Sequence, residues 1–231
     1  MNSLKPIETA FVLGAGLGTR LRPLTEECPK PLLPVRGRPM VEYVFEKLAV
    51  GGIRRFIVNT HHAAERWQRQ FPDHQWQGVP IIFRHEPMLL GTAGGLKNIE
   101  DLVGGETILL HSGDVVTNFN LRPLFDKHAN GEAEVTLALR DNGTKAIGLN
   151  ASGEIKKIGR PDANDRLDWY DYANVAIIDP RFLQRIPDAR PRVIADVWRT
   201  MLASGGLQGC VANDGYWHNI GTLEEYENFN R

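Results

Sequence analysis

The sequence predicts an α/β fold: a single-domain, Rossmann-like three-layer sandwich in which helices cover both faces of a mixed, mostly parallel central sheet. Through the first half of the chain, short apolar runs alternate with helical patterns, which is the order of βαβ units. The second half contains a hairpin pattern, and a hairpin beside a parallel sheet makes the sheet mixed. A length of 231 residues suits one α/β core, so we expect a single domain over residues 1–231.

The first half supplies the alternating elements. Its clearest element is a helix over residues 40–50, whose apolar residues recur at helical spacing between Pro39 and the stop signal Gly51. A first strand is predicted at residues 11–13, directly before a glycine-rich stretch. Further strands are predicted at residues 55–59, 80–85, 107–111 and 134–140, and further helices at 63–70 and from near residues 94 and 121.

The second half is less regular. Two short strands are predicted at residues 146–150 and 154–159, joined by a tight turn that ends in Gly153. The aperiodic stretch 160–171 is interpreted as a mobile loop beside the substrate site. A strand at residues 172–178, a helix at 193–203 and a capping box that opens a C-terminal helix, formed by Thr222 and Glu225, complete the prediction.

Composition excludes several classes of partner. A net charge of -1 gives no overall attraction to nucleic acid or to anionic lipid, so any anion must be bound by a local site. No apolar run approaches the roughly 18 residues that a membrane span needs, and residues 1–10 do not resemble a secretion signal. Cys28 and Cys210 make no disulfide framework. We therefore expect a cytoplasmic protein with reduced thiols.

A glycine loop follows the first predicted strand. Gly14, Gly16 and Gly18 occupy three of five positions, which lets successive backbone N–H groups approach a phosphate chain. The spacing does not match a dinucleotide fingerprint, which would need a third glycine where Thr19 stands, and a Walker loop ending is absent. A glycine turn without a ligand is the alternative.

Two basic residues follow the glycines before the first long helix. Lys30 lies between Pro29 and Pro31, which restrict the backbone on both sides, so its ammonium group is presented from a stiffened segment. We interpret Lys30 and Arg20 as cations that face a triphosphate. The alternative is ordinary solvated surface charge.

Residues 13–25 together with residues 29–32 resemble the hallmark motif of the sugar-1-phosphate nucleotidyltransferase family. Further similarity lies at residues 91–96, 113–114 and 217–222, so the resemblance covers nearly the whole chain. It implies a Rossmann-like fold of the GT-A-like kind, and the length is similar to that of compact members that act on N-acetylmuramate, mannose or heptose 1-phosphate. Gly14 stands where the family usually has alanine, which we interpret as a small change.

The resemblance implies Mg²⁺ as cofactor. It identifies Asp114, just after a predicted strand, as the metal aspartate, although a turn-forming aspartate is the alternative from the residues alone. The second metal position carries Asn219 where the family usually has aspartate, and asparagine offers only a neutral carbonyl oxygen. Three outcomes follow: a weaker site, magnesium held mainly by Asp114 and substrate phosphates, or a homologue that binds without turnover. We favour the second.

The resemblance also assigns the substrate contacts. The predicted nucleotide-binding residues are Leu13, Gly14, Ala15, Gly16, Gly18, Thr19, Arg20, Lys30, Glu86, Gly91 and Thr92, with Glu86 and Gly91 against the base. The predicted sugar-phosphate residues are Ser112, Gly148, Asn174 and Arg160. Arg160 stands near the place of a lysine in larger members, and a solvated hairpin edge is the alternative for it. Gly91 is alternatively only part of a flexible helix entry.

These assignments predict an enzyme that joins a nucleoside triphosphate to a sugar 1-phosphate and releases pyrophosphate, with Arg20, Lys30 and Asp114 as the catalytic residues. A catalytically silent nucleotide-sugar sensor is a second hypothesis, and a non-sugar acceptor such as phosphocholine is a third. We expect a monomer or a homodimer. The base and the sugar do not follow from these residues.

Overall fold

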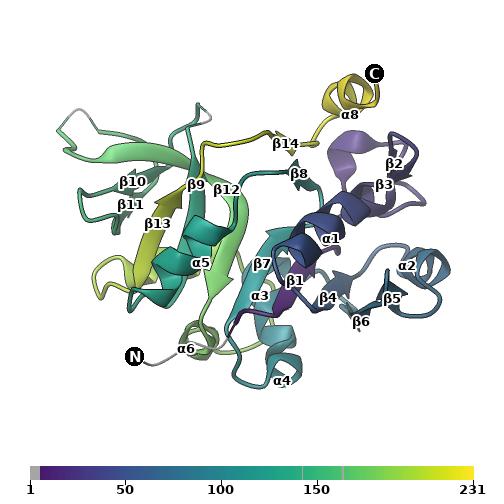
Figure 1. Ribbon diagram of the computed structural model, residues 1–231, viewed down its shortest axis with the longest axis horizontal. Coiled ribbons are helices and arrows are strands. Elements are labelled where there is room, and N and C mark those ends of the chain that lie inside the picture. Colours follow the sequence, from purple (N-terminus) through teal and green to yellow (C-terminus); the bar gives the residue numbers. More distant parts are fainter. Residues whose placement is uncertain (1–5, 142, 163) are drawn as a thin grey trace.

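The protein is described by a computed structural model that covers residues 6–141, 143–162 and 164–231. A ten-stranded sheet runs through the molecule, and Figure 1 shows its two ends on opposite sides of the view. Its centre is parallel, in the order β7-β1-β4-β6. These central strands are β1 (Thr9–Leu13), β4 (Arg55–Thr60), β6 (Val79–His85) and β7 (Ile108–Ser112).

Antiparallel strands flank this parallel centre. The long strand β12 (Asp168–Ile178) pairs with β7 on one side and with both β9 and β10 on the other. The remaining strands of the sheet are β5 (Gln75–Trp76), β9 (Val135–Arg140), β10 (Ile147–Leu149), β11 (Ile155–Ile158) and β13 (Leu207–Val211). The predicted α/β fold with a mixed, mostly parallel central sheet is therefore confirmed.

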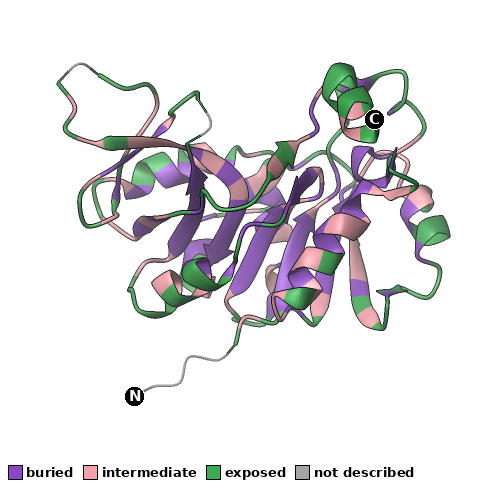
Figure 2. Ribbon diagram, turned by 45° about the horizontal axis from the view of Figure 1, so that its top comes forward, coloured by how far each residue is buried: buried purple, intermediate pink, exposed green. Residues whose placement is uncertain are grey.

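Helices cover both faces of the sheet, because successive strand residues point to opposite sides. In β1, Phe11 joins one hydrophobic cluster while Ala10 and Val12 join the other, and all three are fully buried. Figure 2 shows the sheet as the most buried layer. The first cluster packs against α3 (Gly91–Asn98), α4 (Glu100–Val103), α6 (Pro180–Gln184) and α7 (Ile194–Met201), and the second against α1 (Met40–Val50), α2 (Glu65–Gln70) and α5 (Arg122–Ala129).

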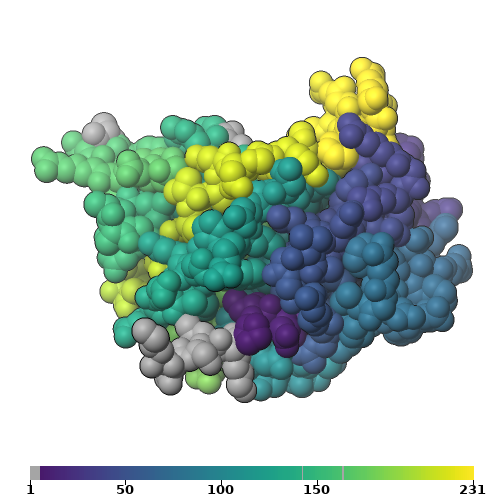
Figure 3. All heavy atoms as spheres, viewed as in Figure 1, coloured from purple at the N-terminus to yellow at the C-terminus, as the bar shows by residue number. Residues whose placement is uncertain are grey.

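Short elements link the two ends of the chain. The strand β14 (Trp217–Asn219) pairs with β8 (Val115–Thr117), and α8 (Leu223–Asn230) lies against the hairpin of β2 (Pro34–Val35) and β3 (Arg38–Pro39). In Figure 3 the yellow C-terminal segment crosses the surface to the upper right, where it meets the indigo region that holds β2, β3 and α1 in Figure 1. Residues after 210 therefore reach the loops that follow β1 and β7.

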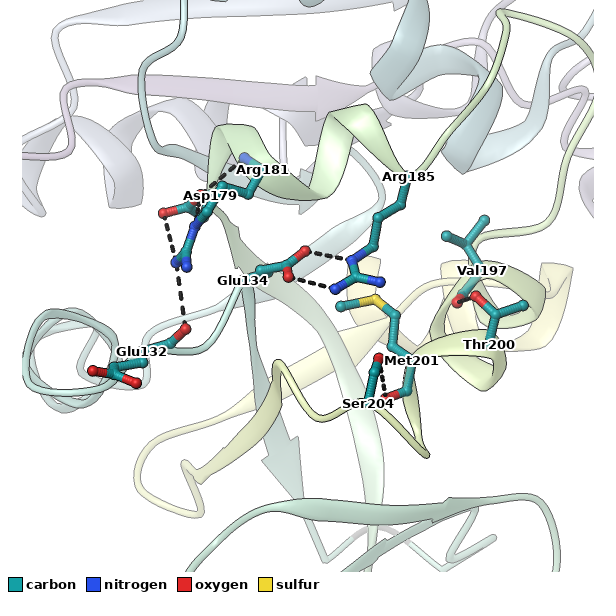
Figure 4. Close-up of polar contacts among 9 residues, drawn as sticks. All are labelled: Glu132, Glu134, Asp179, Arg181, Arg185, Val197, Thr200, Met201 and Ser204. Carbon is teal, nitrogen blue, oxygen red and sulfur yellow. Dashed lines mark hydrogen bonds and ion pairs between the residues drawn. The ribbon is translucent and has the colours of Figure 1, made fainter.

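The helix α6 is held to the sheet by two arginines. Glu134, just before β9, accepts hydrogen bonds from Nε and Nη2 of Arg185, each at 2.6 Å (Figure 4). Asp179 caps the helix by accepting a 2.9 Å bond from the backbone N–H of Arg181. The planar, two-bond pair of Glu134 and Arg185 fixes the direction in which the chain leaves β12 toward α7.

Most predicted elements are confirmed, and one prediction needs correction. The helix at residues 40–50 and the capping box of Thr222 and Glu225 are present as predicted. The interpretation of residues 160–171 as loop is wrong from Asp168 onward, because β12 begins there and pairs with β10. The sequence analysis also missed β13. Among the described residues, no helix is long and apolar enough to cross a membrane.

Candidate functional site

A cleft of about 360 Å³ opens where β1, β4 and β7 end. Parallel strands place their carboxyl ends at one edge of the sheet, and ligands of open α/β sheets collect there. Twelve residues predicted from the sequence line it: Leu13, Ala15, Gly16, Gly18, Thr19, Arg20, Lys30, Glu86, Gly91, Thr92, Ser112 and Asp114. The structure adds Pro31, Asn59, Leu89 and Gly221. The cleft thus joins residues that are more than two hundred positions apart.

Gly14 opens the glycine loop but does not line the cleft. Its backbone N–H donates to Oδ1 of Asn59 at 2.7 Å. A Cβ atom at Gly14 would stand 2.7 Å from both the Asn59 carbonyl oxygen and the Trp67 ring. The interpretation of Gly14 as a small change from alanine is therefore corrected, because this chain has no room for the methyl group.

The next glycines differ from Gly14 in their surroundings. A Cβ atom at Gly16 would meet nothing within 4 Å, so its exposed backbone is open to a ligand. Gly18 has φ 60°, which a residue with a side chain rarely adopts, and its carbonyl accepts a 2.9 Å bond from Oγ1 of Thr25. The loop is therefore shaped before any ligand arrives.

The two predicted cations occupy different environments. Arg20 is exposed, and its Nη2 atom would stand 3.1 Å from a Cβ atom placed on Gly221. Lys30 is only 7% exposed, in a short 3₁₀ turn, η2 (Lys30–Leu32), and its Nζ donates to Oδ2 of Asp114 at 2.5 Å. The cation predicted for phosphate and the carboxylate predicted for metal are therefore paired with each other across the cleft.

The opposite wall of the cleft is built around Glu86. This carboxylate is fully buried, with Oε1 accepting from Nδ2 of Asn59 at 2.8 Å and Oε2 accepting from the Leu90 N–H at 3.0 Å. Both oxygens are therefore used by the protein. The predicted base contact of Glu86 stays a prediction, and the structure gives its side chain a role in holding the segment from Glu86 to Leu90.

The amino end of α3 completes this wall. Gly91 has φ 65°, and a Cβ atom there would stand 2.8 Å from the carbonyl oxygen of Arg192. That same carbonyl accepts a 3.2 Å bond from the Ala93 N–H, and the Arg192 N–H donates to Leu90 at 2.9 Å. Gly91 is therefore more than a flexible helix entry, since it lets the chain before α7 cross directly over the start of α3.

Asn219 does not line the cleft of Asp114. Strand pairing places it opposite Val115, and the next residue, Ile220, donates its N–H to the Asp114 carbonyl at 3.3 Å. Asn219 instead lines a neighbouring cavity of about 660 Å³, with Tyr216, Trp217, His218 and Phe229 among its other residues. In the described part of the chain, no three His, Cys, Asp or Glu side chains gather as a metal site.

The predicted sugar-phosphate residues are spread out. Ser112 lines the cleft, and Asn174 lies on β12 next to Val175, which pairs with His111 at the end of β7. Asn174 has φ 59° at a register shift between Tyr172 and Ala176, a backbone conformation that is uncommon outside functional or turn positions. The role of Asn174 stays a prediction.

Gly148 and Arg160 lie outside the cleft. Gly148 pairs with Trp169, and a Cβ atom there would stand 3.2 Å from that indole ring. Arg160 is exposed after β11, where the neighbouring Lys157 pairs with Asp165 at 2.8 Å. Neither residue lines the cleft, so their predicted contacts would need a substrate that extends beyond it.

Sequence reasoning missed Asn59, Leu89 and Gly221 as lining residues. Asn59 is the penultimate residue of β4 and links Gly14 to Glu86 through its side-chain amide. Its signal was available, because a polar residue at the carboxyl end of a buried parallel strand points to the ligand edge of the sheet. Gly221 lies in the segment 217–222 that resembles the family, but that resemblance assigned it no role. Its place depends on the pairing of β14 with β8.

Comparison with known proteins gives consistent results. Residues 9–147 match the model of the nucleotidyl transferase family. The chain is 32% identical over 228 residues to a mannose-1-phosphate guanylyltransferase of Mycobacterium tuberculosis, covering 94% of this chain and 62% of that protein. It is 28% identical over 221 residues to an N-acetylmuramate alpha-1-phosphate uridylyltransferase of Neisseria meningitidis, covering 93% of each. It therefore spans only about three fifths of the first relative.

A solved structure shares the fold. A UTP-bound UGPase from Acinetobacter baumannii superposes with a TM-score of 0.81, covering 97% of this chain and 92% of that chain, at 16% sequence identity. At that identity the likeness supports the architecture and not the substrate.

Proposed function

The chain belongs to the nucleotidyl transferase family, and we propose that it transfers a nucleoside monophosphate from a nucleoside triphosphate to a sugar 1-phosphate. One observation carries the proposal: the glycine loop, Lys30 and Asp114 meet in a single cleft at the carboxyl edge of the parallel strands. The named relatives support the acceptor class, since both act on sugar 1-phosphates. The finer identity of base and sugar lies beyond this proposal.

The proposed step is an in-line displacement at the α-phosphorus. A phosphate oxygen of the sugar 1-phosphate forms the new bond to that phosphorus, while the bond to the bridging oxygen of the β-phosphate breaks and pyrophosphate leaves. No general base is needed, because the attacking phosphate oxygen is already ionised at neutral pH. The protein's task is to hold two anions together and to neutralise charge in the transition state.

The chain's own residues divide this task. The exposed backbone at Gly16 and the shaped loop at Gly18 receive the phosphates, and Arg20 reaches them from the rim. Lys30 lies deeper and is stiffened by its 3₁₀ turn, so it meets the phosphates with little loss of side-chain freedom. Ser112 and Asn174 are proposed to face the acceptor.

Mg²⁺ is the proposed cofactor, and the donor set fits it with one carboxylate. Asp114 faces the cleft with its side chain 25% exposed, and magnesium commonly takes one or two protein carboxylates with phosphate oxygens and water. When bound, the ion would supply positive charge to the phosphates. Asn219 lies on β14, opposite Val115 of β8, and offers only a neutral oxygen. We therefore assign Asp114 as the main ligand.

A substrate panel tests the proposal. The protein is incubated with Mg²⁺, each of ATP, GTP, CTP, UTP and dTTP, and mannose, glucose, heptose and N-acetylmuramate 1-phosphates, and pyrophosphate is measured. We expect release with at least one pair, and its loss in Asp114→Asn. Phosphocholine is included as a non-sugar acceptor. Pyrophosphate that appears only with phosphocholine would move the acceptor out of the sugar class.

Asn219 supports a second candidate function. A protein with one metal carboxylate fits a sensor that binds a nucleotide sugar without turnover. The same panel separates the two functions: measurable triphosphate binding with no pyrophosphate from any pair would favour the sensor. Asn219→Asp provides a matched variant: because Asn219 lines the neighbouring cavity and not the cleft, we expect no gain of turnover, and a gain would show that residue 219 reaches the metal once substrates are bound.

A further inference from the structure

Two adjacent histidines follow β4 between the two walls of the cleft. His61 Nδ1 lies 2.7 Å from the carbonyl oxygen of Glu86, in the wall that leads to α3. His62 Nε2 lies 2.9 Å from the carbonyl oxygen of Thr25, behind the glycine loop. A carbonyl oxygen only accepts, so each of these ring nitrogens carries a hydrogen and donates it.

The backbone turn after β4 separates the two rings. Ala63 has φ 46°, in the left-handed region that a residue with a side chain rarely adopts. His61 is bridged to Ala63, and α2 begins two residues later at Glu65. Because of this tight turn, neighbouring side chains reach segments that belong to different walls. Strain of this kind is typically retained where the position has a function.

Each histidine bond continues into the residues that line the cleft. On one side, Thr25 is 1% exposed, and its hydroxyl donates to the carbonyl oxygen of Gly18. Because His62 in turn donates to the carbonyl oxygen of Thr25, it supports the glycine loop through this one residue. On the other side, the Glu86 N–H donates to Thr60 at 2.8 Å, so His61 completes a second backbone bond that fixes Glu86. The two walls are thereby tied to the end of β4.

We propose that His61 and His62 are positioning residues that hold the two walls of the nucleotide cleft at a fixed separation, each through one ring N–H group. The inference rests on the proposed function, since it takes a nucleoside triphosphate as the ligand between those walls. His62 acts on the phosphate side and His61 on the side of the base. Neither ring touches the reacting atoms in this assignment.

Matched amide substitutions test the inference. A glutamine places its N–H₂ group near the position of ring Nε2, and an asparagine places it near Nδ1. We therefore expect His62→Gln to bind triphosphate within twofold of wild type, while His62→Asn and His62→Ala bind about tenfold more weakly, as expected for one lost bond that positions a loop. For His61 the order is reversed: His61→Asn retains affinity, and His61→Gln and His61→Ala lose it.

The ligand series separates positioning from general damage. Affinity is measured by calorimetry with ATP, GTP, CTP, UTP and dTTP, and by NMR titration with the nucleoside that matches the best triphosphate. His62→Ala should weaken triphosphate binding while nucleoside binding stays within twofold, and His61→Ala should weaken both by the same factor. Thermal unfolding of each variant checks folding, and if a His62 variant unfolds early, Thr25→Val tests the next bond from His62 toward the glycine loop, because it removes the hydroxyl bond to Gly18 and should likewise weaken triphosphate binding more than nucleoside binding.

The outcomes are distinguishable. Equal affinities for the matched and mismatched amides would overturn the positioning roles while leaving the proposed function intact. Equal losses for triphosphate and nucleoside in His62→Ala would overturn the division between the two walls. A wild-type protein that binds none of the five triphosphates would overturn the proposed function itself.

Discussion

At the scale of single residues, the ion pair of Lys30 and Asp114 links two binding events. Each partner is proposed to meet a different ligand, phosphate for the ammonium group and metal for the carboxylate, and the two atoms lie 2.5 Å apart. Lys30 is 7% exposed, so it cannot turn freely into solvent. If Lys30 turns to a bound triphosphate, the carboxylate of Asp114 loses this partner, so we predict that triphosphate and metal bind with positive coupling.

Lys30→Met should separate these effects. Turnover should fall about 100-fold or more, by analogy with the loss of one electrostatic donor. In the absence of nucleotide, however, Mn²⁺ should bind more tightly than to wild type, because the carboxylate of Asp114 has lost its competitor. Electron paramagnetic resonance of free Mn²⁺ measures this directly, with the double variant Lys30→Met, Asp114→Asn as control. Unchanged or weaker Mn²⁺ binding in Lys30→Met would contradict the coupling.

His111 makes stability depend on pH. Its pKa is lowered from 6.5 to about 4, mainly by burial and to a smaller extent by the positive charge of Lys47, while a backbone bond to Ser112 and the charge of Asp114 act in the opposite direction. The unfolded chain takes up this proton near pH 6.5 and the folded chain only near pH 4. The contribution to stability is therefore complete above pH 6.5 and is lost as the pH falls toward 4, about 3 kcal/mol in all.

His111→Asn keeps a donor for the Ser112 carbonyl but cannot take up a proton. The free energy of unfolding is measured with urea at pH 7.5 and at pH 5.0 in both proteins. Between these two pH values it should decrease by about 2 kcal/mol less in His111→Asn than in wild type. The comparison uses the difference between the two pH values, so a general loss of stability in the variant does not affect it. An identical pH dependence in both proteins would show that His111 is not the group responsible.

At the scale of elements, the glycine loop combines two different requirements. Gly14→Ala places a methyl group within 2.7 Å of a backbone oxygen and of the Trp67 ring, so it should destabilise the fold by about 1–3 kcal/mol. Gly16→Ala is the matched control, because its methyl group meets nothing within 4 Å. Urea unfolding should therefore separate the two variants, and equal stabilities would contradict the assigned packing.

Arg140 holds the segment that leads into β14. Its guanidinium is 9% exposed and donates to the backbone oxygens of Ala212, Asp214, Asn213 and Gly215. Arg140→Met removes these donors and should cost about 1–3 kcal/mol, with faster amide exchange over residues 212–219. Arg122→Met is the control, since that exposed arginine pairs only with Asp126 within α5 and should change stability by about 0.5 kcal/mol or less. Comparable losses in both variants would contradict the role of Arg140.

The strand β13, which sequence patterns missed, shows why local signals can fail. In β13, Gly209 interrupts the apolar pattern, yet a Cβ atom there would stand 2.5 Å from Leu139 and 2.7 Å from Leu149. Glycine is needed for that close approach to neighbouring strands, which local propensity does not register. The helix α1 was predicted correctly because its signal, apolar spacing with a start and a stop, is complete within its own residues.

At the scale of the whole molecule, the cleft joins the two ends of the chain. Its lining runs from Leu13, at the end of β1, to Gly221, after β14, and Arg20 lies against Gly221. A ligand between these segments binds the folded state alone, because neither wall exists in the unfolded chain. Binding should therefore appear as stabilisation of the entire fold.

The thermal midpoint measures this stabilisation. A triphosphate at 100 times its dissociation constant adds about 2.7 kcal/mol, which should raise the midpoint by about 5–10 °C in a protein of this size. Differential scanning fluorimetry with and without Mg²⁺ follows the shift, and at the same triphosphate concentration Lys30→Met should lose most of it. A triphosphate that binds by calorimetry without raising the midpoint would contradict binding to the folded cleft.

Patterns within the sequence predicted the central strands, the longest helix and the glycine loop, because these signals depend on residues close together in the chain, and the family resemblance singled out Lys30 and Asp114. Only the tertiary structure decided that Lys30 and Asp114 pair directly and that Asn219 lies in a separate cavity. It also decided that His61 and His62 reach opposite walls. Strand pairing and a left-handed turn bring these residues together. The residues are far apart in the sequence, so no local sequence pattern could predict their contacts.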